Sequence, residues 1–269
     1  MTVKALILAF CVAGAATQAA AAPIPLRCTA MADATDGRRL VHEGRCNVRV
    51  TAASTFKIAL SLMGYDSGYL VDEHTPLLPF QQGYTDWNPA WRSATAPTSW
   101  MNDSVVWYSQ KLTTKLGHVR FQRYVNGFKY GNRDLSGTSH GNDGLTRAWL
   151  NASLKVSPLE QVDFLTKVVN RKLPVKAKAY EMTQRLLKRE TLPNGWEIYG
   201  KTGTGHPLLG DGKSDYAHSY GWYVGWASKG QRTIVFARLA QDQKEEAGNA
   251  GQRVTEAFLR ELPARLDAL

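Results

Sequence analysis

Strand-like segments lie at both ends of this chain, and helical segments lie between them. The strand-like patterns fall at about 26–31, 39–42, 196–203, 218–228 and 232–240. Such strands bury their apolar faces only by sharing a sheet, so we predict an α/β (α+β) fold. The N- and C-terminal segments would form one antiparallel sheet flanked by helices, and residues of about 65–190 a helical lobe. The cleft between sheet and lobe is the expected site.

Helix signals support this division. Ser157-Pro158-Leu159-Glu160 is a helix start in which Ser caps, Pro takes the first turn and Glu reaches back. Helices are expected over about 100–115, 118–128, 158–171 and 175–189, and a last amphipathic helix over 249–262. A further helix is expected from Ser54, with Gly64 able to end it.

Residues 1–22 are predicted to be an export signal. Lys4 precedes the apolar run Ala5 to Ala16, and Ala19 to Ala22 offer a cleavage site. A membrane anchor is the less favoured alternative, because spanning takes about 20 apolar residues. Residues 23–269 would then be an exported, periplasmic or secreted catalytic domain without a stable membrane anchor.

Three cysteines leave one pair after export. Cys11 lies in the expected signal, whereas Cys28 and Cys46 remain in the mature chain. In an oxidising compartment this pair could form a disulfide worth about 3 kcal/mol. Two reduced thiols become the better interpretation only if there is no export signal.

The formal charge of +10 raises the question of nucleic-acid binding. Lys and Arg are interleaved with Asp and Glu, and the densest stretch, Lys167 to Arg189, has the spacing of a solvated helix face. We therefore predict no nucleic-acid partner. Metal chemistry is not predicted either, because the six histidines form no close pair with ligand spacing and there is no cysteine cluster.

The segment Ser54-Thr55-Phe56-Lys57 carries the main chemical signal. A serine hydroxyl needs a base within hydrogen-bonding reach, and residues three apart on a helix share a face. A helix start also directs backbone N–H groups at a developing oxyanion. The segment is otherwise apolar, so the lysine needs a functional reason.

Three further elements strengthen this interpretation: Lys201-Thr202-Gly203 on a predicted strand, Ser104-Val105-Val106, and Tyr130-Gly131-Asn132 in a loop. S-x-x-K followed by K-T-G is the signature of penicillin-recognising serine enzymes. With Trp149 and the strand Gly221 to Trp226, the chain resembles class D (oxacillinase-like) serine β-lactamases over essentially its whole mature length. Y-G-N, where class A enzymes carry S-D-N, favours class D. The resemblance implies a β-lactamase/transpeptidase-like fold.

The resemblance also implies roles for individual residues. Lys57 would be carboxylated by carbon dioxide and serve as general base, Trp149 would hold the carbamate, and Ser104 and Lys201 would relay protons. The N–H groups of Ser54 and Thr204 would form the oxyanion hole, and no other cofactor is implied. The substrate-binding set would comprise Val106, Tyr130, Thr202, Gly203, Thr204 and Arg253, with Arg253 pairing with the drug carboxylate.

Elementary chemistry agrees with a carbamate. Only a neutral amine attacks carbon dioxide, and burial among apolar groups lowers the pKa of a lysine. Phe56, Val105, Val106, Trp149 and Leu150 are expected to supply that setting, although for Val105, Val106 and Leu150 core packing alone would also explain the residue.

Two other motif matches are rejected. Gly195 to Thr202 fits the phosphate-loop pattern, but its bulky interior reads as a strand, and the glycines and proline after it oppose a following helix. Gly137 to Gly141 fits the G-x-S-x-G elbow, but its flanks form turns.

The sequence thus predicts hydrolysis of small-molecule β-lactams through an acyl-enzyme on Ser54. Two alternatives remain: a penicillin-binding DD-peptidase acting on cell-wall peptides, and a sensor domain that is acylated without turnover. It makes no prediction of the oligomeric state or of the preferred β-lactam.

Overall fold

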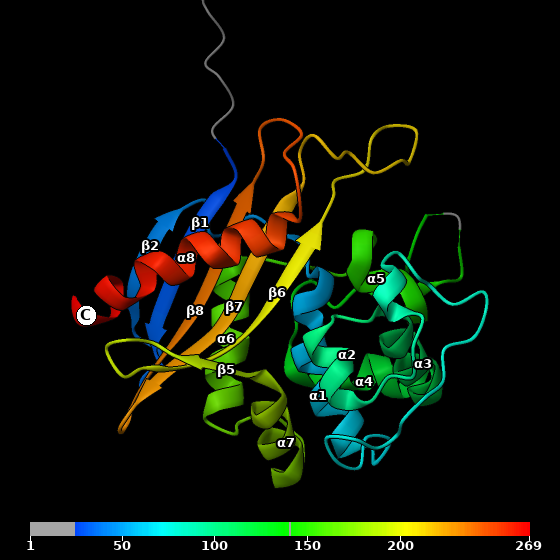
Figure 1. The fold of residues 1–269 in the computed structure, drawn as a ribbon, viewed down its shortest axis with the longest axis horizontal. Helices are drawn as coiled ribbons and strands as arrows, with labels where there is room; N and C mark the ends of the chain where they lie inside the picture. Colours follow the sequence, from blue (N-terminus) through cyan, green and yellow to red (C-terminus); the bar gives the residue numbers. More distant parts are fainter. Residues whose placement is uncertain (1–24, 140) are drawn as a thin grey trace, which may run out of the picture.

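The computed structural model describes residues 25–139 and 141–269. A six-stranded sheet is covered by a helix on each face, and a group of helices lies beside it (Figure 1). The expected export signal lies outside the described residues. Within the described ranges, no helix is both long and apolar enough to cross a bilayer.

The sheet is antiparallel, with strand order β2-β1-β8-β7-β6-β5. Its strands are β1 (Arg27–Asp33), β2 (Arg39–Gly44), β5 (Lys188–Thr191), β6 (Glu197–Gly205), β7 (Tyr220–Lys229) and β8 (Arg232–Gln241). Leu239 of β8 lies opposite Cys28 on one side and Trp222 on the other, so the two ends of the chain meet at β8. The predicted sheet of N- and C-terminal segments is confirmed.

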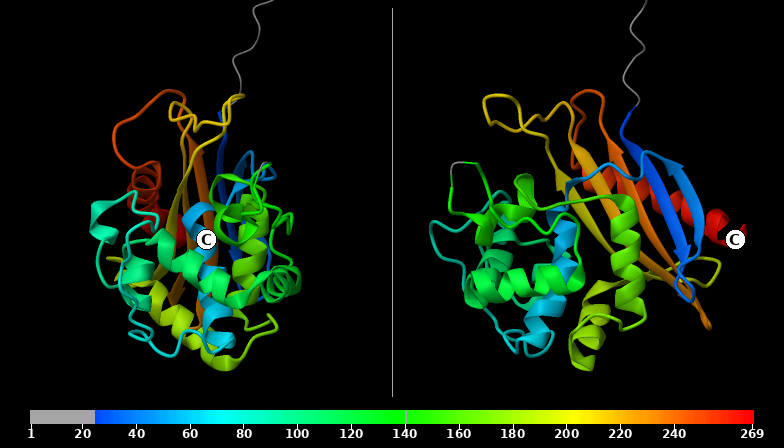
Figure 2. Two further views of the ribbon diagram at one scale, coloured as in Figure 1. Left: turned by 90° about the vertical axis from the view of Figure 1, so that its right-hand side faces the viewer. Right: turned by 180° about the vertical axis from the view of Figure 1, so that it is seen from behind.

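One helix covers each face of this sheet (Figure 2). Helix α8 (Ala250–Asp267) packs against β6, β7 and β8, and α6 (Pro158–Val169) packs against β1, β7 and β8. Because both faces are covered, β7 is buried from Tyr220 through Ala227. The predicted capping box is present: Ser157 Oγ accepts from the Glu160 N–H, and Glu160 accepts from the Ser157 N–H.

The remaining helices surround α1 (Lys57–Asp66). They are the short η1 (Ala53–Phe56) and η2 (Pro89–Trp91), with α2 (Pro97–Asn102), α3 (Val106–Leu116), α4 (His118–Phe128), α5 (Gly144–Asn151) and α7 (Ala177–Leu187); a small sheet pairs β3 (Val50–Thr51) with β4 (Lys155–Val156). Helix α1 is buried from Lys57 through Tyr65 because other elements enclose it.

Two expectations need adjustment. The helices between 65 and 190 do not all form one lobe, because α6 packs against the sheet. Gly64 does not end α1, which runs to Asp66, since a glycine there makes room for Leu70 and Leu112; a Cβ would meet the Leu70 side chain at 2.7 Å.

The two rejected motif matches have no support in the backbone. Lys201 and Thr202 lie inside strand β6, so the phosphate-loop match contains no loop followed by a helix. Residues 132–139 form neither strand nor helix, so the G-x-S-x-G match lacks the strand that a nucleophile elbow requires.

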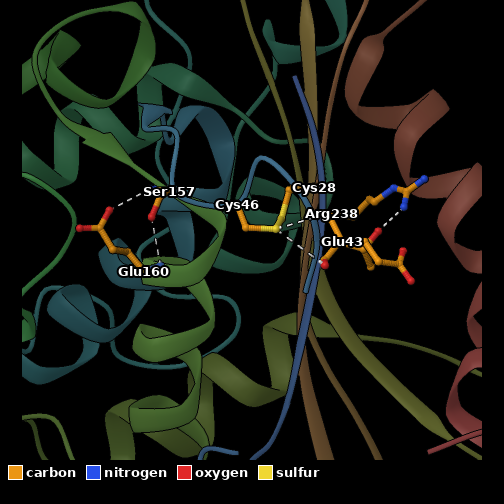
Figure 3. The surroundings of a disulfide bond; sticks show 7 residues. Cys28, Glu43, Cys46, Ser157, Glu160 and Arg238 are labelled. Atoms are coloured by element: carbon orange, nitrogen blue, oxygen red, sulfur yellow. Dashed lines mark hydrogen bonds between the residues drawn. A yellow bond between two sulfur atoms is a disulfide. The ribbon is translucent and has the colours of Figure 1, made fainter. Parts of the chain in front are cut away.

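Cys28 and Cys46 are joined by a disulfide (Figure 3). Cys28 lies on β1 and Cys46 two residues after the end of β2, and both are buried. The Cys46 carbonyl accepts from the Leu159 N–H at the start of α6. The bridge therefore ties the β1–β2 hairpin to the helix that covers one face of the sheet.

We expect replacement of both cysteines by alanine to lower the free energy of unfolding by about 3 kcal/mol, because the bridge restricts the unfolded chain. Catalytic turnover at 25 °C should change little, since the bridge lies on the far strands of the sheet. Denaturant unfolding with parallel turnover assays measures both effects. Two free thiols per chain in denatured, unreduced protein would contradict the bridge.

Candidate active site

The candidate nucleophile Ser54 lies in η1, at the point where the chain enters α1. Ala53 before it has φ 48°, and such a left-handed conformation costs a non-glycine residue roughly 1–3 kcal/mol. Lys57, three residues on, is fully buried, and its Nζ donates to Ser54 Oγ at 3.3 Å. The predicted serine–lysine pair is thus within hydrogen-bonding reach.

Strand β6 passes directly over this pair. A Cβ on Gly203 would lie 3.0 Å from Thr55 Cγ2 and 3.3 Å from the Ser54 nitrogen. These contacts are tight enough that a side chain at position 203 would require Thr55 or β6 to shift by a few tenths of an ångström. Gly203 thus brings the K-T-G strand and the nucleophile together.

The two lysines of the motifs are buried near each other. Burial holds the pKa of Lys57 well below its usual range, and the charge of Lys201 lowers it further. Burial, followed by the Arg189 guanidinium, lowers the pKa of Lys201 to about 7, against an opposing effect of Asp103. Burial thus favours the neutral form of Lys57, and Lys201 titrates near neutral pH.

Two polar atoms here are buried without a hydrogen-bond partner among the described residues: Ser104 Oγ and Trp149 Nε1. Ser104 has φ 60°, a second strained position, in the turn between α2 and α3. The indole of Trp149 packs on Phe56, the residue before Lys57, with ring centroids 5.7 Å apart. Buried polar groups are nearly always paired, so both atoms are candidates for hydrogen bonds to a bound or covalently attached group.

Tyr130 and Val106 lie behind the site. Both are at most 2% exposed. The Tyr130 hydroxyl donates to Gln161 Oε1 at 3.4 Å, and Gln161 Nε2 donates to Thr55 Oγ1 at 2.9 Å. Tyr130 thus reaches the nucleophile segment through Gln161 on α6. Sequence reasoning missed Gln161, since nothing in its local pattern distinguishes it from other helical glutamines.

Thr204 and Arg253 lie where β6 meets the start of α8. The Thr204 hydroxyl donates to Asn249 Oδ1 at 2.6 Å and accepts from the Gly251 N–H at 2.8 Å. Arg253 is paired with Asp242 and donates to the carbonyl groups of Ala247 and Gly248. Arg253 therefore lies in the first turn of α8, which packs against β6, and its guanidinium is engaged with Asp242.

In the described part of the chain, no three His, Cys, Asp or Glu side chains are grouped so that they could hold a metal ion. The Lys57 amine contacts Ser54 Oγ, the Lys201 amine acts on Lys57, and the Trp149 indole packs on Phe56. Such a set suits nucleophilic attack with proton transfer.

Comparison with known proteins shows which family the chain belongs to. Residues 27–264 match the model of the penicillin binding protein transpeptidase domain, so the protein belongs to the transpeptidase-like serine enzymes. β-lactamase OXA-9 of Klebsiella pneumoniae is 42% identical over 242 residues, covering 88% of this chain and 87% of that protein. β-lactamase OXA-1 of Escherichia coli is 37% identical over 220 residues, covering 81% of this chain and 74% of its own.

A solved structure agrees. The crystal structure of the class D β-lactamase OXA-427 matches with a TM-score of 0.85 and 47% identity, covering 90% of this chain and 99% of that one. The chain belongs to the class D serine β-lactamases. The predicted family and fold are confirmed, and the β-lactamase interpretation is favoured over the peptidase and sensor alternatives.

We expect Gly203→Ala to lower kcat/KM for a penicillin roughly ten- to hundredfold, because the added methyl displaces β6 from η1. Gly210→Ala is the matched control, since a Cβ there meets nothing within 4 Å. Steady-state kinetics with thermal unfolding of both variants provides the test. Full activity in Gly203→Ala would show that the close approach is not required.

Proposed function

We propose that this protein hydrolyses the β-lactam amide through a covalent acyl-enzyme on Ser54, with Lys57 supplying the base. The observation that carries the proposal is the Lys57–Ser54 hydrogen bond at 3.3 Å, made by a buried amine whose pKa is depressed. A neutral amine beside a serine hydroxyl is the arrangement that activates the hydroxyl.

The residues around Lys57 fit a carboxylated amine. Neutral Lys57 can add to carbon dioxide, forming an N–C bond and releasing a proton, and the buried indole N–H of Trp149 is free to donate to the resulting carboxylate. When present, that group supplies a general base at the site. The same amine, Lys57 Nζ, donates a hydrogen bond to Ser54 Oγ.

The chain's own groups carry the steps. Ser54 Oγ loses its proton and attacks the lactam carbonyl carbon, while the N–H groups of Ser54 and Thr204 hold the developing oxyanion. As the lactam C–N bond breaks, Ser104 and Lys201 deliver a proton to the departing nitrogen. Lys201, with a pKa of about 7, can give and regain that proton near neutral pH. Water then cleaves the Ser54 ester and regenerates the hydroxyl.

The substrate carboxylate would bind at the β6–α8 junction, to Thr202 and Arg253. Thr202 is half-buried on β6, and Arg253 lies one turn into α8. The ion pair with Asp242 holds the guanidinium in place, and the carboxylate partly offsets the positive charge of the guanidinium. Val106 and Tyr130 are buried next to the site and support it by packing. Tyr130 also helps to position Thr55, because its hydroxyl bonds Gln161, which bonds Thr55.

The cellular setting completes the proposal. Residues 1–22 direct export to the periplasm or medium, and residues 23–269 form the catalytic domain. The substrate is a small molecule, with no nucleic-acid partner. A DD-peptidase or a sensor would also become acylated on Ser54, but each would release the acyl group slowly, so the deacylation rate discriminates between the three.

Ser54→Ala should abolish turnover and covalent labelling by penicillins while leaving the fold intact, because it removes the hydroxyl to which Lys57 donates. Mass spectrometry after incubation with a penicillin is the measurement, and circular dichroism is the check on folding. An adduct on another serine, such as Ser139, would refute the assignment.

Activity should fall as pH is lowered and recover with added bicarbonate. The sign follows from the depressed pKa of Lys57: above that pKa the amine is neutral and can be carboxylated, and below it the charged amine cannot. Deacylation should suffer most, because the attacking water needs the base. Rates across pH, with and without bicarbonate, provide the test.

Trp149→Phe should increase the bicarbonate requirement, because it removes the indole donor and keeps an aromatic ring. Trp107→Phe is the matched control: that indole is equally buried but donates to the Trp91 carbonyl, away from Lys57. Flat bicarbonate dependence in wild type and Trp149→Phe alike would exclude the carbamate and leave Ser54 as nucleophile.

A further inference from the structure

Arg189 lies on β5, the edge strand next to β6. All four β5 residues are exposed. The pairing of β5 with β6 is regular at Lys188 opposite Tyr199 and at Thr191 opposite Glu197, but it shifts between them. An irregularity of this kind can redirect a side chain, and here it covers Arg189 and Glu190.

The Arg189 guanidinium bonds two segments that are far apart in sequence. Its Nε donates to the Gly200 carbonyl at 3.0 Å, and its Nη1 donates to Asn102 Oδ1 at 2.7 Å. Gly200 directly precedes Lys201, and Asn102 is the last residue of α2, two before Ser104. One side chain therefore spans from the K-T-G strand to the turn that carries the strained Ser104.

We propose that Arg189 is a positioning residue for acylation, which sets the spacing between Ser104 and Lys201 by holding Gly200 and Asn102 at once. The inference rests on the proposed function, in which these two groups deliver the proton to the departing nitrogen. Proton transfer depends steeply on the donor–acceptor distance, and the planar guanidinium fixes two hydrogen bonds in one geometry.

Arg189 also contributes charge. The charged groups that act on Lys201 are Arg189 from β5 and Asp103 from the turn after α2, and Lys201 in turn acts on Lys57 of α1. Arg189 lowers the pKa of Lys201 and Asp103 opposes it. Removing the guanidinium therefore raises the pKa of Lys201, whereas removing Asn102 leaves that charge in place. The two contributions of Arg189 can thus be separated.

The experiment is a double-mutant cycle in the full mature chain with Arg189→Met, Asn102→Leu and the double variant. Single-turnover kinetics with a chromogenic cephalosporin measures acylation and deacylation of Ser54 separately. Arg185→Met is the matched control, because Arg185 is an exposed arginine on α7 paired with Glu73 and away from Lys201. Thermal unfolding is followed for every variant.

Each single variant should slow acylation about tenfold, and the double variant should also be slowed about tenfold rather than about a hundredfold, since both changes break one bridge. Deacylation should stay within about twofold, because it needs no proton from Ser104. In a plot of acylation rate against pH, the inflection due to Lys201 should move to higher pH in Arg189→Met. In Asn102→Leu it should stay where it is in wild type.

Three results would overturn the proposal: wild-type acylation in Arg189→Met, multiplicative losses in the double variant, or equal slowing of both steps together with a lowered Tm, as expected of a merely structural residue. These outcomes all require that wild type is acylated on Ser54. If neither wild type nor Arg185→Met is acylated there, the proposed function itself fails, and that result is distinct from a failure of the Arg189 bridge alone.

Discussion

The contact between β6 and η1 is the constraint on which the site depends. The nucleophile belongs to a helix start and the K-T-G segment to a strand, and they meet because Gly203 has no side chain to hold them apart. Sheet and helices then hold the two parts of this contact: β7 and α8 support β6, and α1 and α5 pack against η1. A site assembled between two rigid layers keeps its geometry better than one carried on loops.

Burial of two lysines at this contact gives the site its chemistry. Each amine loses its hydration, and this desolvation is the main reason why both pKa values are lowered. The charge of Lys201 lowers the pKa of Lys57 further, and the Arg189 guanidinium lowers that of Lys201. A neutral Lys57 can act as a base or be carboxylated, while Lys201 titrates near neutral pH. The desolvation that costs stability is the same effect that makes these groups reactive, which is the usual trade at a functional site.

A layer of supporting contacts holds the reactive groups from behind. Gln161 on α6 fixes Thr55, Thr204 fastens β6 to α8, and Arg189 connects Gly200 with Asn102. None of the three interactions joins neighbours in the chain, and no catalytic or binding motif includes Gln161 or Arg189. These residues therefore contribute through geometry that only the folded chain creates.

The sequence by itself determined the sheet of two chain ends, the capped α6, the disulfide pair and the reactive motifs, because each rests on local patterns: strand alternation, capping chemistry, cysteine number and the spacing of Ser54 and Lys57. Only the tertiary structure decided that α6 covers the sheet, that Tyr130 is buried behind the site, and that Arg253 is engaged with Asp242. It also decided that Arg189 reaches across to Asn102. Most of these contacts join segments that are far apart in the sequence, and their existence depends on how layers pack, which no local pattern encodes.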